Sequence, residues 1–307
     1  KEGKSPTVVA LLDTCDDANP PSILETQLAS NRIKKDLKDK KSLVLYGNDS
    51  SEFEKCYAFL ANTKKIKNSS ERITKLMSLG AQITRTLKSS NISESVLTVS
   101  DQLSKNLTDE EFAAILSGMT LGNYKFSRKG PKNTENENRQ DQNGNIAAAG
   151  EEDEPKNYLV KSVEVVNNSF NSEEEHADFL IKSARYTLLA RELTNERANI
   201  ANTDYFLNLA KEFQKSNSDR VNIQYIIGED LAKQGLNLHY NVGKGSNNPP
   251  ILVNLSYKGN PKSDKYQALV GKGIVFDAGG LNIKSTGFME TMYMDKAGAC
   301  ASFATFK

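Results

Sequence analysis

The segment that most constrains this chain lies near its end, from Val270 to Lys284. It reads Val-Gly-Lys-Gly-Ile-Val-Phe-Asp-Ala-Gly-Gly-Leu-Asn-Ile-Lys, so an apolar triplet at 274–276 leads directly into Asp277 and a Gly-Gly pair. A run of β-branched and aromatic residues that ends at glycines predicts a buried strand followed by a turn. A glycine lies on each side of Lys272, and glycines permit the close approach of another backbone or of an ion.

The polar residues of this region form a candidate set of metal ligands. Asp277 and Asp295 supply carboxylate oxygens, which divalent cations bind readily. Lysine is an unusual ligand because its amine must be neutral to donate a lone pair, but burial and a neighbouring dication both favour loss of the proton from Lys272. A structural interpretation is also available, since an aspartate before Gly-Gly is commonly a turn residue.

The spacing of these residues resembles the signature of the leucyl aminopeptidases, a family of dinuclear-zinc metallopeptidases. That signature has a Val-Gly-Lys-Gly strand, a metal-bridging Asp, a Gly-Gly turn, a catalytic Lys and a second metal-binding Asp. The successive offsets from Lys272 to Asp277, to Lys284 and to Asp295 are 5, 7 and 11, as in the family. The resemblance extends upstream through residues 193–195 and 242–250, and more weakly through 121–126.

The resemblance implies a role for each of these residues. Asp277 would bridge two divalent metal ions, Zn²⁺ or Mn²⁺, and Lys272 and Asp295 would complete the tighter site. Lys284 would be the catalytic residue, a protonated amine that stabilises the oxyanion of the transition state. These four residues and Met292, which would line the pocket for the first substrate side chain, would bind the substrate. The family also holds a bicarbonate near the reacting water.

The implied function is a metal-dependent aminopeptidase that releases N-terminal apolar residues, such as leucine, from peptides by means of a water activated by two metals. The resemblance further implies that the peptidase assembles as a homo-hexamer in the cytoplasm.

Two departures from the family pattern leave a second interpretation open. Asp295 is followed by Lys-Ala-Gly where the family usually has Met-Gly-Gly, so Lys296 is expected to place a cation beside the metal site. The family's remaining ligands come from an Asn-Thr-Asp-Ala-Glu-Gly-Arg segment that would follow Lys307, so the printed chain is expected to be incomplete for activity. The alternative is a catalytically inactive aminopeptidase-like protein with a structural or assembly role. The presence of both lysines and both aspartates favours the enzyme.

The 307 residues are sufficient for two domains, and strand-like runs alternate with helical periodicity, which indicates an α/β fold. We expect an N-terminal α/β domain over residues 1–169, a linker helix over 170–192, and the first part of a mixed-sheet α/β metallopeptidase domain over 193–307. Strands are predicted at 7–12, 43–46, 96–99, 158–166, 221–227, 251–257 and 274–276, and helices at 73–87, from 108, at 204–213, 229–233 and 297–306.

Residues 128–156 are predicted to form a disordered surface insertion. Between Phe126 and Tyr158 the only large apolar residue is Ile146, and the remainder is dominated by Asn, Gln, Glu, Lys and Gly. Such a segment buries too little apolar surface to offset the entropy lost on ordering.

The overall composition excludes several classes of partner. Forty Lys and Arg against thirty-nine Asp and Glu leave a net charge of +1, so no global field attracts nucleic acid or an anionic membrane. No apolar run approaches the ~20 residues needed to span a bilayer. The three cysteines are scattered without a Cys-x-x-Cys pair, which is typical of a reducing compartment. We therefore expect peptide substrates, with neither nucleic acid nor membrane as a partner.

Overall fold

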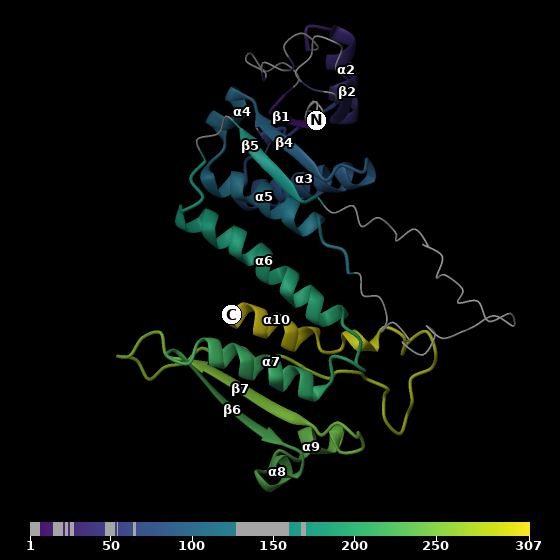
Figure 1. The fold of residues 1–307 in the computed structure, drawn as a ribbon, viewed down its shortest axis with the longest axis vertical. Helices are drawn as coiled ribbons and strands as arrows, with labels where there is room; N and C mark the ends of the chain where they lie inside the picture. Colours follow the sequence, from purple (N-terminus) through teal and green to yellow (C-terminus); the bar gives the residue numbers. More distant parts are fainter. Residues whose placement is uncertain are drawn as a thin grey trace, which may run out of the picture. The chain divides into compact units, whose positions relative to one another are not determined.

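The structure is a computed structural model that describes residues 7–14, 21, 24, 28–46, 53, 55–63, 66–126, 160–166 and 170–307 (Figure 1). The predicted insertion at 128–156 lies outside these residues. The chain divides into two compact units, Lys1–Arg185 and Tyr186–Lys307, and helix α6 (Glu175–Asn195) contains the division. The domain limits given above stay a prediction. Among the helices that the structure describes, none combines the length and hydropathy of a membrane span.

The first unit is built on a five-stranded sheet with the strand order β2-β3-β1-β4-β5. Strand β1 pairs in parallel with β3 and β4, and β4 pairs in parallel with β5, whereas β2 runs antiparallel to β3 at the edge. The strands are β1 (Thr7–Leu12), β2 (Ser42–Tyr46), β3 (Lys55–Leu60), β4 (Glu94–Val99) and β5 (Ser162–Val166). The predicted strands of this unit are confirmed, except at the start of the one predicted at 158–166. There β5 begins only at Ser162, residues 160 and 161 are not in a strand, and residues 158 and 159 lie outside the described part of the chain.

Strand β1 is apolar throughout because both faces of the sheet are covered. Its alternate residues Val9 and Leu11 join one core cluster, and Val8, Ala10 and Leu12 join the other. The first cluster includes residues of α3 (Ser69–Ser89), α4 (Asp101–Asn106) and α5 (Asp109–Gly122), and the second includes Leu37 of α2 (Asn31–Lys40).

Helices α3 and α5 cross at glycines. A Cβ on Gly80 would lie 2.0 Å from the carbonyl oxygen of Ile115, and a Cβ on Gly118 would lie 1.9 Å from that of Met77. Only glycine therefore permits this crossing. The helix predicted from residue 108 is confirmed as α5, and it begins with a capping box in which Thr108 and Glu111 each accept a hydrogen bond from the other's backbone amide.

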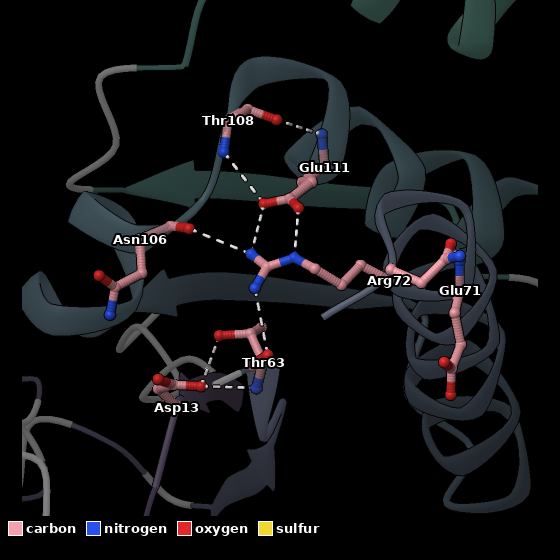
Figure 2. Close-up of polar contacts among 8 residues, drawn as sticks. Asp13, Thr63, Glu71, Arg72, Asn106, Thr108 and Glu111 are labelled. Carbon is pink, nitrogen blue, oxygen red and sulfur yellow. Dashed lines mark hydrogen bonds and ion pairs between the residues drawn. The ribbon is translucent and has the colours of Figure 1, made fainter. Parts of the chain in front are cut away.

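Glu111 also anchors a polar network that joins several elements of the first unit (Figure 2). The guanidinium of Arg72 in α3 binds both carboxylate oxygens of Glu111, with Nη2 2.8 Å from Oε2, and donates to the carbonyls of Thr63 and Asn106 at 3.1 and 3.3 Å. Thr63 in turn donates its amide and its hydroxyl to Oδ1 of Asp13, both at 2.8 Å. The hydrogen bond to Glu111 raises the pKa of Arg72, so the guanidinium stays charged.

The second unit contains a two-stranded antiparallel ribbon, β6 (Val221–Ile227) and β7 (Ile251–Tyr257), connected through α8 (Glu229–Lys233) and α9 (Asn237–Gly243). Helix α7 (Thr203–Ser216) contacts the ribbon. Its Phe213 also contacts Phe303 and Phe306 of α10 (Ala297–Phe306), with ring centroids 5.7 and 6.1 Å apart. Figure 1 shows α7 between the ribbon and α10. This packing fixes the helix that follows Asp295.

Most predicted elements of the second unit are confirmed, including α7, β6, α8, β7 and α10. The predicted strand at 274–276 is wrong. Residues 258–291, all of which the structure describes, contain neither helix nor strand. A strand requires the backbone hydrogen bonds of a neighbour, and the only ladder among the described residues of this unit joins β6 and β7. The apolar composition of the triplet is therefore insufficient to make a strand.

Candidate metal centre

The backbone of Lys272 lies against the first turn of α10. Its carbonyl accepts a hydrogen bond of 2.8 Å from the amide of Ala299. A Cβ on Gly271 would lie 2.5 Å from Cα of Ala299 and 2.6 Å from the carbonyl oxygen of Gly298, so this position requires glycine. Gly273 is less constrained, because its Cβ would meet only the Ala299 methyl at 3.2 Å. The first of the two predicted glycine roles, close approach of another backbone, is thus confirmed at Gly271.

The packing of this turn brings Lys272 to Asp295. Asp295 follows the 3₁₀ helix η4 (Met292–Met294) and directly precedes α10. Its Oδ2 lies 2.9 Å from Nζ of Lys272. The two charges form an ion pair without the angles of a hydrogen bond, so this buried oxygen has no hydrogen-bond partner. The carboxylate and the amine that meet here are both groups that can act as donors to a divalent cation.

Asp277 is fixed by the turn that follows it. Its Oδ1 accepts a hydrogen bond of 2.8 Å from the amide of Gly279. Gly279 and Gly280 have φ angles of 104° and 129°, which a side chain would strain. The turn also brings Nζ of Lys284 to 3.4 Å from Oδ2 of Asp277. The hydrogen bond from Gly279, and then the charges of Lys284 and Lys272, lower the pKa of Asp277, so its carboxylate is held in the ionised form that a metal requires.

The four residues selected from the sequence therefore form two ion pairs, Lys272 with Asp295 and Lys284 with Asp277. Lys272 also acts electrostatically on Asp277, which links the two pairs. Two carboxylates and an amine fit the donor preferences of a divalent cation. Within the described residues no group of three or more His, Cys, Asp or Glu side chains could hold a metal. The candidate donors here are thus the two aspartates and Lys272.

Two further residues near Asp295 complete the description of the site. Met292, the predicted pocket residue, begins η4 and is half-buried. Lys296, which the sequence places beside the metal site as a free cation, is instead completely buried. Its amine donates to the carbonyls of Thr194 at 3.2 Å, of Glu196 at 2.7 Å and of Tyr293. This role of Lys296 was not predicted from the sequence, although residues 193–195, which include its partner Thr194, belong to the family resemblance.

Comparisons with known proteins show which family this chain resembles. The profile of the cytosol aminopeptidase family, catalytic domain, matches residues 188–307. A probable cytosol aminopeptidase of Sulfurihydrogenibium sp. is 32% identical over 237 residues, which cover 76% of this chain and 42% of that relative.

Two solved structures share the fold. The leucyl aminopeptidase from Trypanosoma brucei in complex with actinonin superposes with a TM-score of 0.65 at 23% identity, over 99% of this chain and 54% of that one. The bottromycin maturation enzyme BotP in complex with Mn gives a TM-score of 0.62 at 19% identity, over 98% of this chain and 56% of that one. At these identities the likeness shows the fold alone, and it confirms the predicted α/β class.

The chain spans about half the length of the relatives that it matches. The part that matches the family profile contains Lys272, Asp277, Lys284 and Asp295, the residues of the two ion pairs. The chain therefore belongs to the cytosol aminopeptidase family, whose catalytic-domain profile includes its residues 188–307.

Proposed function

We propose that this protein is a metal-dependent aminopeptidase that releases N-terminal apolar residues from peptides. The observation that carries the proposal is the meeting of Lys272 and Asp295 at a buried carboxylate oxygen that lacks a hydrogen bond, beside the paired Asp277 and Lys284. The membership of the chain in the cytosol aminopeptidase family supports the same activity.

The residues present fit a divalent metal centre. Lys272, Asp277 and Asp295 would hold the ions, with Zn²⁺ and Mn²⁺ as the candidates, and the Mn complex of BotP supports a divalent ion in this fold. When bound, two such ions supply polarisation of the scissile carbonyl and a nucleophilic water. The bicarbonate that the family resemblance implies has no residue assigned to it in the described chain.

The chain's own residues contribute the remaining chemistry. The Lys284 amine is a charged donor outside the ligand set, and Asp277 at 3.4 Å holds it toward the site. It would stabilise the negative charge that develops on the carbonyl oxygen of the substrate. The carboxylate of Asp295 would accept a hydrogen bond from the free amino group of the peptide. Met292 would provide an apolar contact for the first side chain, which favours leucine-like residues.

We also propose, from the family resemblance, that the protein works as a homo-hexamer in the cytoplasm. Light scattering after size-exclusion chromatography of the full-length protein tests the assembly, and a monomer would contradict it.

The second candidate function is a structural or assembly role without catalysis. It is favoured by one observation: the described residues contain no group of three His, Cys, Asp or Glu side chains able to hold a metal. The presence of Lys284 outside the ligand set argues against it, because a scaffold has no need of a charged donor beside two carboxylates.

Metal-dependent turnover separates the two candidates. The full-length protein is stripped with a chelator and reloaded with Zn²⁺ or Mn²⁺, and the release of leucine from leucine p-nitroanilide is measured. We expect turnover only after reloading, and its loss in Asp295→Asn. Asp264→Asn, at an exposed aspartate of the same unit, serves as the matched control and should retain activity. Absence of turnover with every metal would support the scaffold.

A further inference from the structure

Lys296 is buried with its charge, and every hydrogen-bond donor of its amine is used. The side chain is completely inaccessible to solvent, and Nζ donates to the carbonyls of Thr194, Glu196 and Tyr293. A protonated lysine has three N–H donors, and a neutral one has two. The three backbone acceptors therefore account for every donor that the amine of a lysine can offer.

The environment compensates the buried charge. Thr194 and Glu196 lie at the C-terminal end of α6, where the last carbonyls of a helix lack partners and carry partial negative charge. The carboxylate of Glu196, which is also buried, adds a favourable charge interaction. Lys296 thus caps the end of one helix while it begins another, α10. An apolar side chain at this position would leave three carbonyls without this donor.

The same lysine adjoins Asp295, one of the candidate ligands. Asp295 directly precedes it, and the third carbonyl that it binds, that of Tyr293, belongs to η4 on the other side of Asp295. The first turn of α10, which follows Lys296, contacts Lys272 through the hydrogen bond from Ala299. The amine of Lys296 therefore fixes the short segment that determines how far Asp295 lies from Lys272.

We propose that Lys296 is a positioning residue for the metal centre: by bonding the end of α6 to η4, its ammonium holds Asp295 at the distance from Lys272 that metal binding requires. This inference rests on the proposed function. It also gives a physical account of the departure from the family pattern at this position. Lys296 does not weaken the site as an adjacent cation, because its amine is bound to backbone carbonyls and orders the segment that carries a ligand.

The test is the metal affinity of Lys296→Met in the full-length protein. Methionine keeps most of the length of the side chain but has no donor. We expect the Kd for Mn²⁺, measured by calorimetry on the folded variant, to rise about 10–100-fold, as when an outer hydrogen bond to a metal ligand is removed. The matched control is Lys233→Met, which makes the same change at a side chain that is 71% exposed and should leave the Kd unchanged.

The outcomes separate this inference from the proposed function. If the wild-type protein binds Mn²⁺ and Lys296→Met binds it equally well, the positioning role is overturned and the aminopeptidase proposal stands. If the wild-type protein binds no metal, the proposed function fails and this inference fails with it. A purely structural role would lower the melting temperature of Lys296→Met without changing the Kd.

A second variant covers the case in which Lys296→Met does not fold. Lys296→Gln keeps two N–H donors but loses the charge and one bond, so we expect it to fold and to bind Mn²⁺ more weakly than the wild-type protein. Wild-type affinity in this variant would overturn the proposal. In the wild-type protein, reductive methylation should modify Lys233 and leave Lys296 unmodified, and equal modification of both would also overturn it.

Discussion

Nζ of Lys272 lies 2.9 Å from Oδ2 of Asp295, an oxygen that is buried and accepts no hydrogen bond. The contact depends on Gly271, since a side chain there would collide with the first turn of α10. The ion pair is thus a product of helix packing. It directs an amine and a carboxylate at one point, which is the arrangement that two ligands of a shared ion require.

Replacement of Lys284 by alanine should lower kcat about 10²–10³-fold, because a preorganised charged donor to the oxyanion is lost. Metal content should stay near that of the wild-type protein, since this amine pairs with Asp277 and is not assigned as a ligand. Steady-state kinetics and metal analysis of the full-length variant measure the two quantities. Lys262→Ala, at an exposed lysine, is the control. A metal-free Lys284→Ala protein would show that its role is misassigned.

Gly271→Ala should disrupt the site by displacing α10. The new Cβ would lie 2.5 Å from Cα of Ala299, and overpacking against backbone costs about 1–3 kcal/mol. We expect a lower melting temperature and weaker Mn²⁺ binding, both measured on the full-length protein. Gly245→Ala makes the same change where no atom lies within 4 Å and should alter neither. Equal behaviour of the two variants would rule out the packing role of Gly271.

The ion pair of Arg72 and Glu111 should contribute much more to stability than a pair on the surface. Arg72→Met leaves the buried carboxylate of Glu111 without its partner, so we expect the free energy of unfolding to fall by roughly 2–3 kcal/mol. This is below the ~3–5 kcal/mol typical of fully buried pairs, because solvent still reaches part of Arg72. The shift in the urea midpoint measures the effect.

The control for this prediction is another pair in the same helix. Lys75 and Glu71 form an exposed pair in α3, and Lys75→Met should cost less than about 1 kcal/mol. A loss in Lys75→Met as large as that in Arg72→Met would contradict the distinction between buried and exposed pairs.

The buried thiol of Cys56 should be unreactive in the folded protein. Burial raises its pKa to about 12 from an ordinary value of 9.0, so the reactive thiolate is scarce at pH 8. The thiol ionises near pH 9 in the unfolded chain and near pH 12 in the folded protein. The contribution of the buried neutral thiol to the free energy of unfolding is therefore complete below pH 9 and is lost as the pH rises toward 12. Burial also raises the pKa of Cys300.

Alkylation at pH 8, followed by peptide mass spectrometry, measures this protection. Cys56 and Cys300 should react only after the protein is unfolded in urea. Rapid modification of Cys56 in the folded protein would show that the thiol is accessible, contrary to its position in the core.

The sequence predicted those elements whose local pattern is strong. The runs that became β1, β6 and β7 are apolar or alternating over their whole length, and their bounds agree with the structure. Elements with weaker local patterns were not predicted from the sequence. Helix α9 has no side-chain cap at its N-terminus, and α2 buries only Leu37, so neither is indicated by its sequence. Strand β3 was likewise not identified.

The sequence by itself also determined which residues form the candidate site, because a fixed spacing in a short segment is local information. Lys272, Asp277, Lys284 and Asp295 do meet in two ion pairs. Only the tertiary structure decided that residues 274–276 are not a strand and that Lys296 is buried and bound to the end of α6. Both outcomes depend on partners distant in the sequence: a ladder needs a second strand, and a buried ammonium needs acceptors that only packing brings within reach.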